Sequence, residues 1–169
     1  MTSGLDVELS DLIAHTSISM IFGVVDDDNC VVKIVNRSDI LANEIRILKR
    51  LQAYSGEGII ELVCSSKIAM LLRPRAVTSF NKSQKPTSTL VDIVDKLHIC
   101  HNMGIVHGDV RLSNILVCKD DGLILADFGC SLMVGEVGCI NTYQKWPLTL
   151  CYKLIVIWFY YCITGMEWL

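Results

Sequence analysis

The first half of the chain alternates short apolar runs with polar turn residues, a pattern that predicts β-strands. Residues 15–35 form two such runs around an Asp-Asp-Asp-Asn turn, and residues 59–64 and 67–72 form two more. Residues 1–14 differ, because their leucines recur at roughly helical spacing and predict a short amphipathic piece. We expect these four runs to belong to a small lobe with a five-stranded sheet in this half of the chain.

Apolar residues at helical spacing predict two helices that follow these strands. The first begins at Ser38 or Asp39, either of which can cap it, and runs to about Gln52. The second begins at a capping-box variant at Thr89 and ends at Gly104. The polar residues before the second helix, which include two prolines, predict a linker.

Residues 148–169 are the most apolar stretch of the chain. Their uninterrupted apolar part is shorter than the ~20 residues of a membrane helix, so that a membrane span is not favoured. A helix that is apolar nearly all round belongs in a core or an interface. We therefore predict that self-association or a partner protein covers Leu154–Ile163.

Three oxygen-bearing side chains are spaced along residues 105–131. Asp109 follows a His-Gly pair, Asn114 comes five residues later, and Asp127 opens an Asp-Phe-Gly triplet. Asn114 and Asp127 carry the hard oxygen ligands that Mg²⁺ prefers, and Asp109 has the chemistry to accept the proton of a hydroxyl. Taken singly, each is better explained as a turn cap. Together they form a set of two possible Mg²⁺ ligands and one possible base within a short segment.

Composition narrows the class of protein. The 169 residues are enough for one domain with a real core, and about half of them are apolar (51%). The net charge is −3, no block of Lys and Arg stands out, and nucleic acid is therefore not an expected partner. The eight cysteines lack zinc spacing, and the N-terminus lacks the pattern of a signal peptide. We expect reduced thiols and a cytoplasmic location, with the nucleus as the other possibility.

The order IVHGD, Asn at plus five, apolar run, acidic-Gly turn, apolar run and DFG resembles the catalytic core of the protein kinase family. The resemblance covers roughly residues 21–165. It implies an α+β, two-lobed protein kinase-like fold: a small lobe made of an antiparallel β-sheet plus one helix, and a truncated, mainly helical large lobe. We expect a single domain over residues 1–169, with the small lobe at 15–73, the hinge at 74–88 and a partial large lobe at 89–169.

The same resemblance assigns roles to several residues. Asp109 and Arg111 would be catalytic, Arg111 standing where the family more often has Lys. Asn114 and Asp127 would bind Mg²⁺ and, with the remaining residues, ATP. The other expected nucleotide-binding residues are Gly23, Val31, Lys33 and Glu44.

Lys33 is expected to pair with Glu44, which lies inside the apolar stripe of the first helix and needs a cation there. The expected glycine-rich phosphate loop is degenerate, because only Gly23 remains of its glycines. Gly108 replaces the Arg that commonly receives an activation-loop phosphate, so control by loop phosphorylation is not expected.

The leading function is ATP-dependent, Mg²⁺-assisted phosphotransfer to a Ser or Thr hydroxyl of a protein. A small-molecule kinase of the aminoglycoside or choline type is a second interpretation, because His-Gly-Asp is their usual form of the loop. A third is a non-catalytic pseudokinase that binds nucleotide or regulates another kinase, which the poor glycine loop favours. The expected partners are ATP and a protein substrate or regulated kinase.

Overall fold

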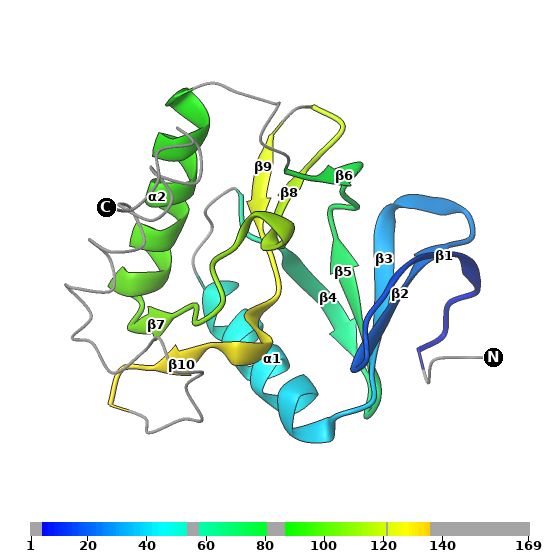
Figure 1. The fold of residues 1–169 in the computed structure, drawn as a ribbon. Helices are drawn as coiled ribbons and strands as arrows, with labels where there is room; N and C mark the ends of the chain where they lie inside the picture. Colours follow the sequence, from blue (N-terminus) through cyan, green and yellow to red (C-terminus); the bar gives the residue numbers. More distant parts are fainter. Residues whose placement is uncertain (1–4, 54–57, 81–86, 121, 136–169) are drawn as a thin grey trace.

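A five-stranded antiparallel sheet and one long helix form the N-terminal lobe of the protein. The structure is a computed structural model and describes residues 5–53, 58–80, 87–120 and 122–135. The strands lie in the order β1-β2-β3-β5-β4, and α1 packs beside the sheet (Figure 1). The bounds are β1 Leu9–His15, β2 Ser19–Val24, β3 Asp27–Val35, α1 Ser38–Leu51, β4 Glu61–Ser65 and β5 Ala69–Arg73.

The second lobe contains α2 and short strands around the acidic segment. The strand β6 leaves the first lobe and pairs with β8, which pairs with β9, while β7 pairs with β10. The bounds are β6 Thr78–Ser79, α2 Thr87–Asn102, β7 Ile105–Val106, β8 Ile115–Val117, β9 Leu123–Leu125 and β10 Leu132–Met133. Two short 3-10 helices, η1 Leu112–Asn114 and η2 Phe128–Cys130, complete this part.

The two faces of β3 point into different cores. Val35 belongs to the main hydrophobic core, with Val31 packed against it, whereas Val32 and Cys30 belong to a second cluster on the opposite face. Lys33 shares the face of Val31 and Val35, as the period-2 alternation predicts. Strand β3 thus places the Lys33 ammonium on the side of the sheet that faces α1.

Helix α1 runs where the apolar stripe predicts it, but it begins differently. Arg37 is the N-cap residue and makes no side-chain capping bond, so that neither Ser38 nor Asp39 caps the helix as expected. Asp39 instead accepts hydrogen bonds from the Arg37 guanidinium. The buried face of the helix consists of Leu41, Glu44, Ile47, Leu48 and Leu51.

The expectation for the N-terminus was wrong, because residues 9–15 form a strand and not a helical piece. Strand β1 pairs with β2 with register shifts between Leu9 and Leu12 and between Leu12 and Ala14. These bulges break the period-2 alternation that would identify a strand in the sequence. The small sheet therefore begins six residues before the expected boundary at residue 15.

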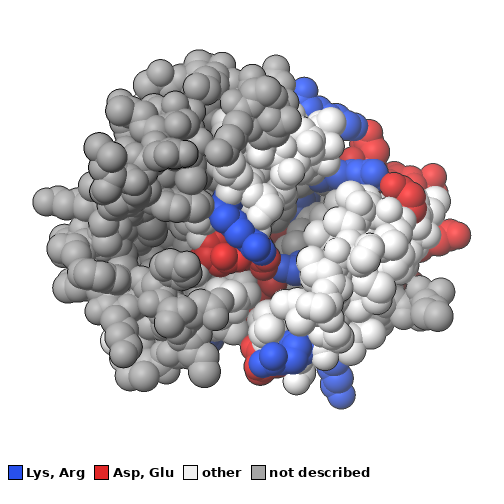
Figure 2. All heavy atoms as spheres, in the orientation of Figure 1, with Lys and Arg blue, Asp and Glu red and all other residues white. Residues whose placement is uncertain are grey.

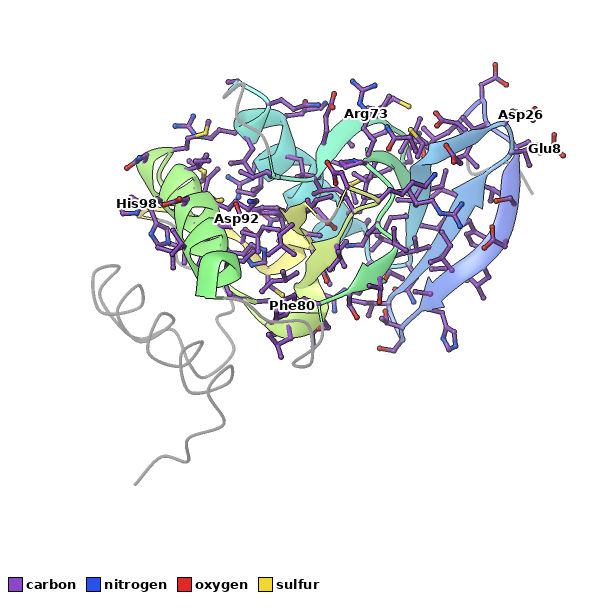
Figure 3. All side chains as sticks on the ribbon, turned by 90° about the horizontal axis from the view of Figure 1, so that it is seen from above. Glu8, Asp26, Arg73, Phe80, Asp92 and His98 are labelled. Atoms are coloured by element: carbon purple, nitrogen blue, oxygen red, sulfur yellow. The ribbon has the colours of Figure 1, made fainter. Side chains whose placement is uncertain are left out.

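One hydrophobic core crosses both lobes. It contains Leu62 and Leu72 of the sheet together with Leu97 of α2 and Leu125 of β9. Figure 3 shows side chains filling the space between the sheet and α2, with Phe80 among them, and Phe80 is buried. Main-chain hydrogen bonds reinforce the connection, since residues 58 and 60 both bond to Leu125.

Some expectations lie outside the described residues. These include the segment 148–169 and the covering of Leu154–Ile163. Within the described residues no helix is long and apolar enough to cross a membrane. Five cysteines are described, and all of them are free thiols, as expected.

Candidate active site

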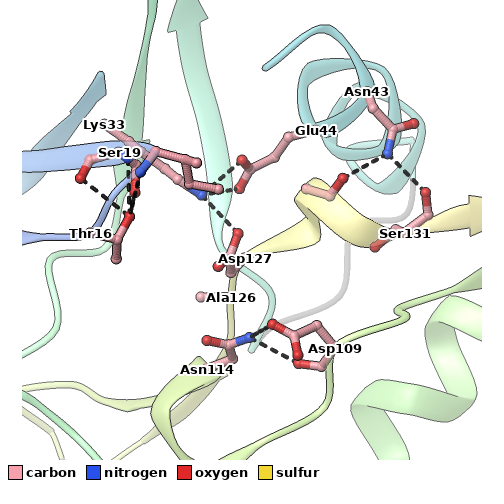
Figure 4. Close-up of polar contacts among 12 residues, drawn as sticks. Thr16, Ser19, Lys33, Asn43, Glu44, Asp109, Asn114, Ala126, Asp127 and Ser131 are labelled. Atoms are coloured by element: carbon pink, nitrogen blue, oxygen red, sulfur yellow. Dashed lines mark hydrogen bonds and ion pairs between the residues drawn. The ribbon is translucent and has the colours of Figure 1, made fainter. Parts of the chain in front are cut away.

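Charged side chains of both signs meet between the two lobes. In Figure 2, Lys and Arg atoms lie beside Asp and Glu atoms near the centre of the face shown. Figure 4 shows the side chains that converge there: Lys33 from β3, Glu44 from α1, Asp127 after β9, and Asp109 with Asn114 opposite them. The structure thus brings together five of the residues expected at the site.

Lys33 lies between two carboxylates. Its Nζ is 2.9 and 2.8 Å from the two Glu44 oxygens and 2.9 Å from Asp127 Oδ1. Lys33 is 7% exposed and Glu44 1%. The predicted ion pair between Lys33 and Glu44 is therefore present, and a second carboxylate joins it.

Burial and pairing compete in setting the pKa values of this cluster. Burial alone would lower the pKa of Lys33, but Glu44 and Asp127 outweigh it and raise the pKa. Burial likewise favours a higher pKa for Asp127, and Lys33 reverses this, so that the pKa of Asp127 is lowered. Burial is the largest influence on Glu44 and raises its pKa. Lys33 thus stays cationic and holds Asp127 ionised.

Asp127 adopts a left-handed backbone conformation with φ of 65°. This conformation is uncommon for a residue with a side chain, and Asn and Asp tolerate it best. It turns the chain at the end of β9 and directs the carboxylate toward Lys33 (Figure 4). Backbone strain of this kind concentrates at functional sites.

Asp109 is held by Asn114 and Arg111. The Asn114 amide nitrogen donates to the Asp109 main-chain oxygen and to Asp109 Oδ2, both at 2.9 Å. Arg111 Nε lies 3.1 Å from the same carboxylate oxygen. Because Asn114 commits its nitrogen to Asp109, its carbonyl oxygen is the atom that remains for a cation. Asp109 and Arg111, the two expected catalytic residues, are thus in contact.

His107 supports the site from below. Its ring is buried, Nε2 lies 3.1 Å from the Ala126 oxygen, and Nδ1 accepts the Asp109 amide at 3.3 Å. The ring also contacts Phe128, with centroids 4.6 Å apart. Burial lowers the pKa of His107 to about 4, so that the imidazole is neutral at neutral pH. The ring therefore serves packing and hydrogen bonding between the segments that carry Asp109 and Asp127.

Two polar residues that sequence reasoning missed connect α1 to the segment after Asp127. The Asn43 side-chain nitrogen donates to the main-chain oxygens of Gly129 at 3.1 Å and Ser131 at 2.8 Å. Ser131 Oγ in turn donates to the His107 oxygen at 2.8 Å. The sequence signal for Asn43 was its position next to Glu44, which is a residue of the buried face of the helix.

The turn between β1 and β2 stands where the phosphate loop was expected, and Gly23 is not part of it. Thr16 Oγ1 accepts the amides of Ile18 at 3.2 Å and Ser19 at 3.0 Å. Those two amides are therefore already bonded within the turn. Gly23 lies inside β2, opposite Val31. Its expected place in the loop was wrong, because β1 begins earlier than the sequence pattern indicated.

Within the described residues, no group of three or more His, Cys, Asp or Glu side chains forms a metal site of protein ligands alone. His98 and His101 of α2 are therefore not part of such a group in this part of the chain. A site built from Asn114 and Asp127 would hold Mg²⁺ only with oxygens from another molecule, which is the usual arrangement for Mg²⁺ and a nucleotide. The residues present fit that requirement.

The fold and this arrangement of Lys33, Glu44, Asp109, Asn114 and Asp127 define a protein of the kinase class. The protein kinase domain model matches residues 18–152, and the chain belongs to the protein kinase family. A chain of the CAK complex of Chaetomium thermophilum bound to ATP-γ-S has a similar fold, with a TM-score of 0.64 and 18% identity over 77% of this chain and 48% of that one. The expected two-lobed fold is therefore confirmed.

Similar sequences are themselves kinases. MAP3K epsilon protein kinase 1 of Brassica napus is 28% identical over 145 residues, which cover 83% of this chain and 11% of that protein. NUAK family SNF1-like kinase 2 of Rattus norvegicus is 41% identical over 56 residues, which cover 33% of this chain and 9% of that protein. The chain thus spans about a tenth of the length of these relatives.

Proposed function

We propose that the protein is an ATP-dependent, Mg²⁺-assisted kinase that phosphorylates Ser or Thr hydroxyls of a protein. The observation that carries the proposal is the Lys33–Glu44–Asp127 network, which is assembled across the cleft from the Asp109–Asn114 pair. Phosphoryl transfer depends mainly on positioning and charge neutralisation, and these five side chains supply both.

Each residue has a role that follows from its contacts. Lys33, fixed by Glu44, would hold the inner phosphates of the nucleotide. Asp127 and the Asn114 carbonyl oxygen would hold Mg²⁺, which would supply positive charge to offset the negative charge of the phosphates. Asp109 would accept the hydrogen bond of the substrate hydroxyl and orient it. Arg111, beside Asp109, would hold the transferred phosphate.

Two comparisons support this choice of nucleotide and acceptor. The structural neighbour belongs to a complex bound to ATP-γ-S, and a relative from Eremothecium gossypii, 32% identical over 78 residues, is the serine/threonine-protein kinase PKH3. The DFG triplet followed by Cys130-Ser131 also favours a protein kinase over a small-molecule kinase.

A second function, that of a regulatory module without catalysis, is favoured by the β1–β2 turn. Its amides of Ile18 and Ser19 are bonded to Thr16 Oγ1 and are not directed at a ligand. A phosphate cover made of free main-chain amides would stabilise the triphosphate, and the loss of such donors weakens binding. The activity is therefore expected to be low.

The test combines nucleotide binding and phosphate transfer. Mg·ATP should raise the melting temperature of the parent, because ligand that binds the native state stabilises it, and Asp127→Ala should lose this shift. Radiolabelled ATP and generic protein substrates should give transfer by the parent and none by Asp109→Ala. The matched control is Asp95→Ala, which removes an exposed carboxylate of α2.

The outcomes separate the two functions. A thermal shift without transfer would favour the regulatory module, and transfer that Asp109→Ala retains would exclude the role of Asp109. No thermal shift in any form, at saturating Mg·ATP, would overturn the nucleotide site itself.

A further inference from the structure

The end of the cleft next to the hinge differs from the end that holds Lys33. Along β3 the chain passes from Lys33 to Val31, and the paired residues of β5 pass from Met70 to Leu72, toward the hinge. If Lys33 holds phosphates, as proposed above, the base of the nucleotide lies at this hinge end. Gly23 of β2 is opposite Val31 and therefore belongs to the same end of the cleft.

The main-chain amide of the hinge residue Arg75 is already hydrogen-bonded within the protein. Its amide donates to the Asn29 oxygen at 2.7 Å, at the start of β3. A buried or bonded amide is not free to bind a base edge, because each N–H is one donor. The hinge thus withholds one of the main-chain groups that would otherwise recognise a nucleobase.

The side chain of Arg75 fills the space above Gly23. A Cβ added at Gly23 would lie 2.8 Å from Arg75 Nη1, 2.9 Å from Asp11 Oδ1 and 2.4 Å from Ser10 Oγ. Cross-strand partners share a face of the sheet, so that these three polar side chains lie on the face of Val31 and Lys33. A side chain at residue 23 would displace these side-chain ends.

Arg75 and Asp11 form an ion pair that joins the hinge to β1. Arg75 Nη2 lies 3.5 Å from Asp11 Oδ2, and Ser10 Oγ donates to Asp11 Oδ1 at 2.9 Å. The bulges of β1 between Leu9 and Ala14 bring Ser10 and Asp11 to this position. A guanidinium and a carboxylate therefore stand where a flat apolar base would need an apolar roof.

We infer that the Arg75–Asp11 ion pair closes the base end of the nucleotide cleft and must open before a nucleobase can enter. The pair is partly exposed, with side-chain exposures of 28% for Arg75 and 64% for Asp11, so that it opens at modest cost. The closed ion pair lowers the affinity for a nucleoside triphosphate, because it hinders binding of the base and not of the phosphates. The phosphate end, built from Lys33, Asp127 and Asn114, is not affected.

The test compares two ligands that differ only in the presence of the nucleoside. Mg·ATP engages both ends of the cleft, whereas magnesium tripolyphosphate engages only the phosphate end. Arg75→Ala should bind Mg·ATP about three- to fivefold more tightly than the parent, the range that opening an exposed ion pair allows. Its affinity for tripolyphosphate, measured by calorimetry, should equal that of the parent.

A second variant and a control complete the design. Asp11→Ala, on an exposed position of β1, should also bind Mg·ATP more tightly, and the double variant should gain less than the sum, because both changes remove one contact. Arg73→Ala is the matched control: Arg73 is also an arginine, the last residue of β5 two positions before Arg75, but its guanidinium pairs with Glu61 on β4. It should leave both affinities unchanged.

The outcomes distinguish this inference from the proposed function. Equal affinity of the parent, Arg75→Ala and Asp11→Ala for Mg·ATP, with tripolyphosphate bound by all, would overturn the inference and leave the nucleotide site in place. Weaker binding of Mg·ATP by Arg75→Ala would overturn it too, because Arg75 would then hold the base by stacking on it. Absence of binding of both ligands to every form would overturn the proposed function and the inference together.

Discussion

Lys33 forms ion pairs with both Glu44 and Asp127, and these pairs determine how much stability is lost when either carboxylate is removed. A double-mutant cycle with Lys33→Met and Glu44→Gln should show coupling of about 0.5–3 kcal/mol in the free energy of unfolding, since the two residues are in contact. Urea unfolding of the four proteins measures it. Strictly additive effects would mean that the pair contributes no specific interaction.

His107 makes the stability of the protein depend on pH. Its folded-state pKa of about 4 lies below the ordinary value of 6.5, so that the unfolded chain binds the proton more readily. Stability is therefore complete above pH 6.5 and is lost as the pH falls toward 4, at up to about 1.4 kcal/mol per pH unit. His107→Gln should show a shallower fall than the parent over this window, measured by urea unfolding at several pH values.

The control for His107 is His15→Gln, which removes one exposed imidazole of β1. Equal slopes for the parent and both variants would contradict the assignment of the acid sensitivity to the buried ring. A uniform loss of stability in His107→Gln at all pH values would not, because the prediction concerns the slope.

Residues whose role depends on short spacing were predictable from the sequence, and those whose role depends on bulges and turns were not. Asp109, Asn114 and Asp127 lie within one local segment whose strands and turns preserve their spacing. Arg75 meets Asp11 only because β1 is bulged and the hinge is bonded to Asn29. Neither condition leaves a pattern in the sequence.

At the scale of elements, Asn43 holds α1 against η2. Removing its side chain leaves the Gly129 and Ser131 oxygens without this donor, and a lost partner of a partly buried group costs about 1–3 kcal/mol. Asn43→Ala should therefore lower the free energy of unfolding by that amount and increase amide exchange in residues 128–133. Hydrogen exchange with mass spectrometry checks both ends of the contact.

The matched control for Asn43 is Arg46→Ala, on the same helix. Arg46 is exposed and donates to Asn43 Oδ1 at 2.8 Å. The substitution therefore removes a neighbour of Asn43 but leaves both Asn43 bonds to the segment after Asp127. It should change stability by less than about 0.5 kcal/mol. Faster amide exchange of residues 128–133 in Arg46→Ala but not in Asn43→Ala would contradict the role of Asn43 in holding α1 against η2.

The elements themselves were predicted unevenly, for physical reasons. Helix α1 ends within one residue of its expected end, because its buried stripe keeps the helical period through Leu51. Strands β8 and β9 coincide with uninterrupted apolar runs that are buried. Helix α2 begins at Thr87, two residues before the capping box at Thr89, since the polar linker does not mark its end.

At the scale of the whole molecule, the single core predicts that the two lobes lose their structure together. Leu125, fully buried in β9, touches the shared core, and Leu125→Ala should destabilise by about 2–5 kcal/mol. Amides of β5 in the small lobe and of α2 in the large lobe should then lose protection at the same denaturant concentration. Separate transitions for the two lobes, followed by hydrogen exchange, would show that the core does not couple them.

The two-lobed fold could be predicted from the motifs, but the continuity of its core could not. The motifs fix which strands carry Lys33 and Asp127, whereas the bonds from residues 58 and 60 to Leu125 join segments more than sixty positions apart. Contacts of that separation depend on the path of the chain and leave no local pattern.

The main-chain bonds from residues 58 and 60 to Leu125 also tie the small lobe to β9 of the large lobe. Helix α1, β4 and β9 share one core, and main-chain bonds join the segment before β4 to β9. The β1–β2 hairpin is held to the rest of the small lobe by contacts at both of its ends. Asn36 fastens its turn through Ser17 and Ile18, and Arg75 fastens its other end through Asp11. If the Arg75–Asp11 pair opens as inferred above, the hinge end of this hairpin loses its ion pair while Asn36 still holds its turn.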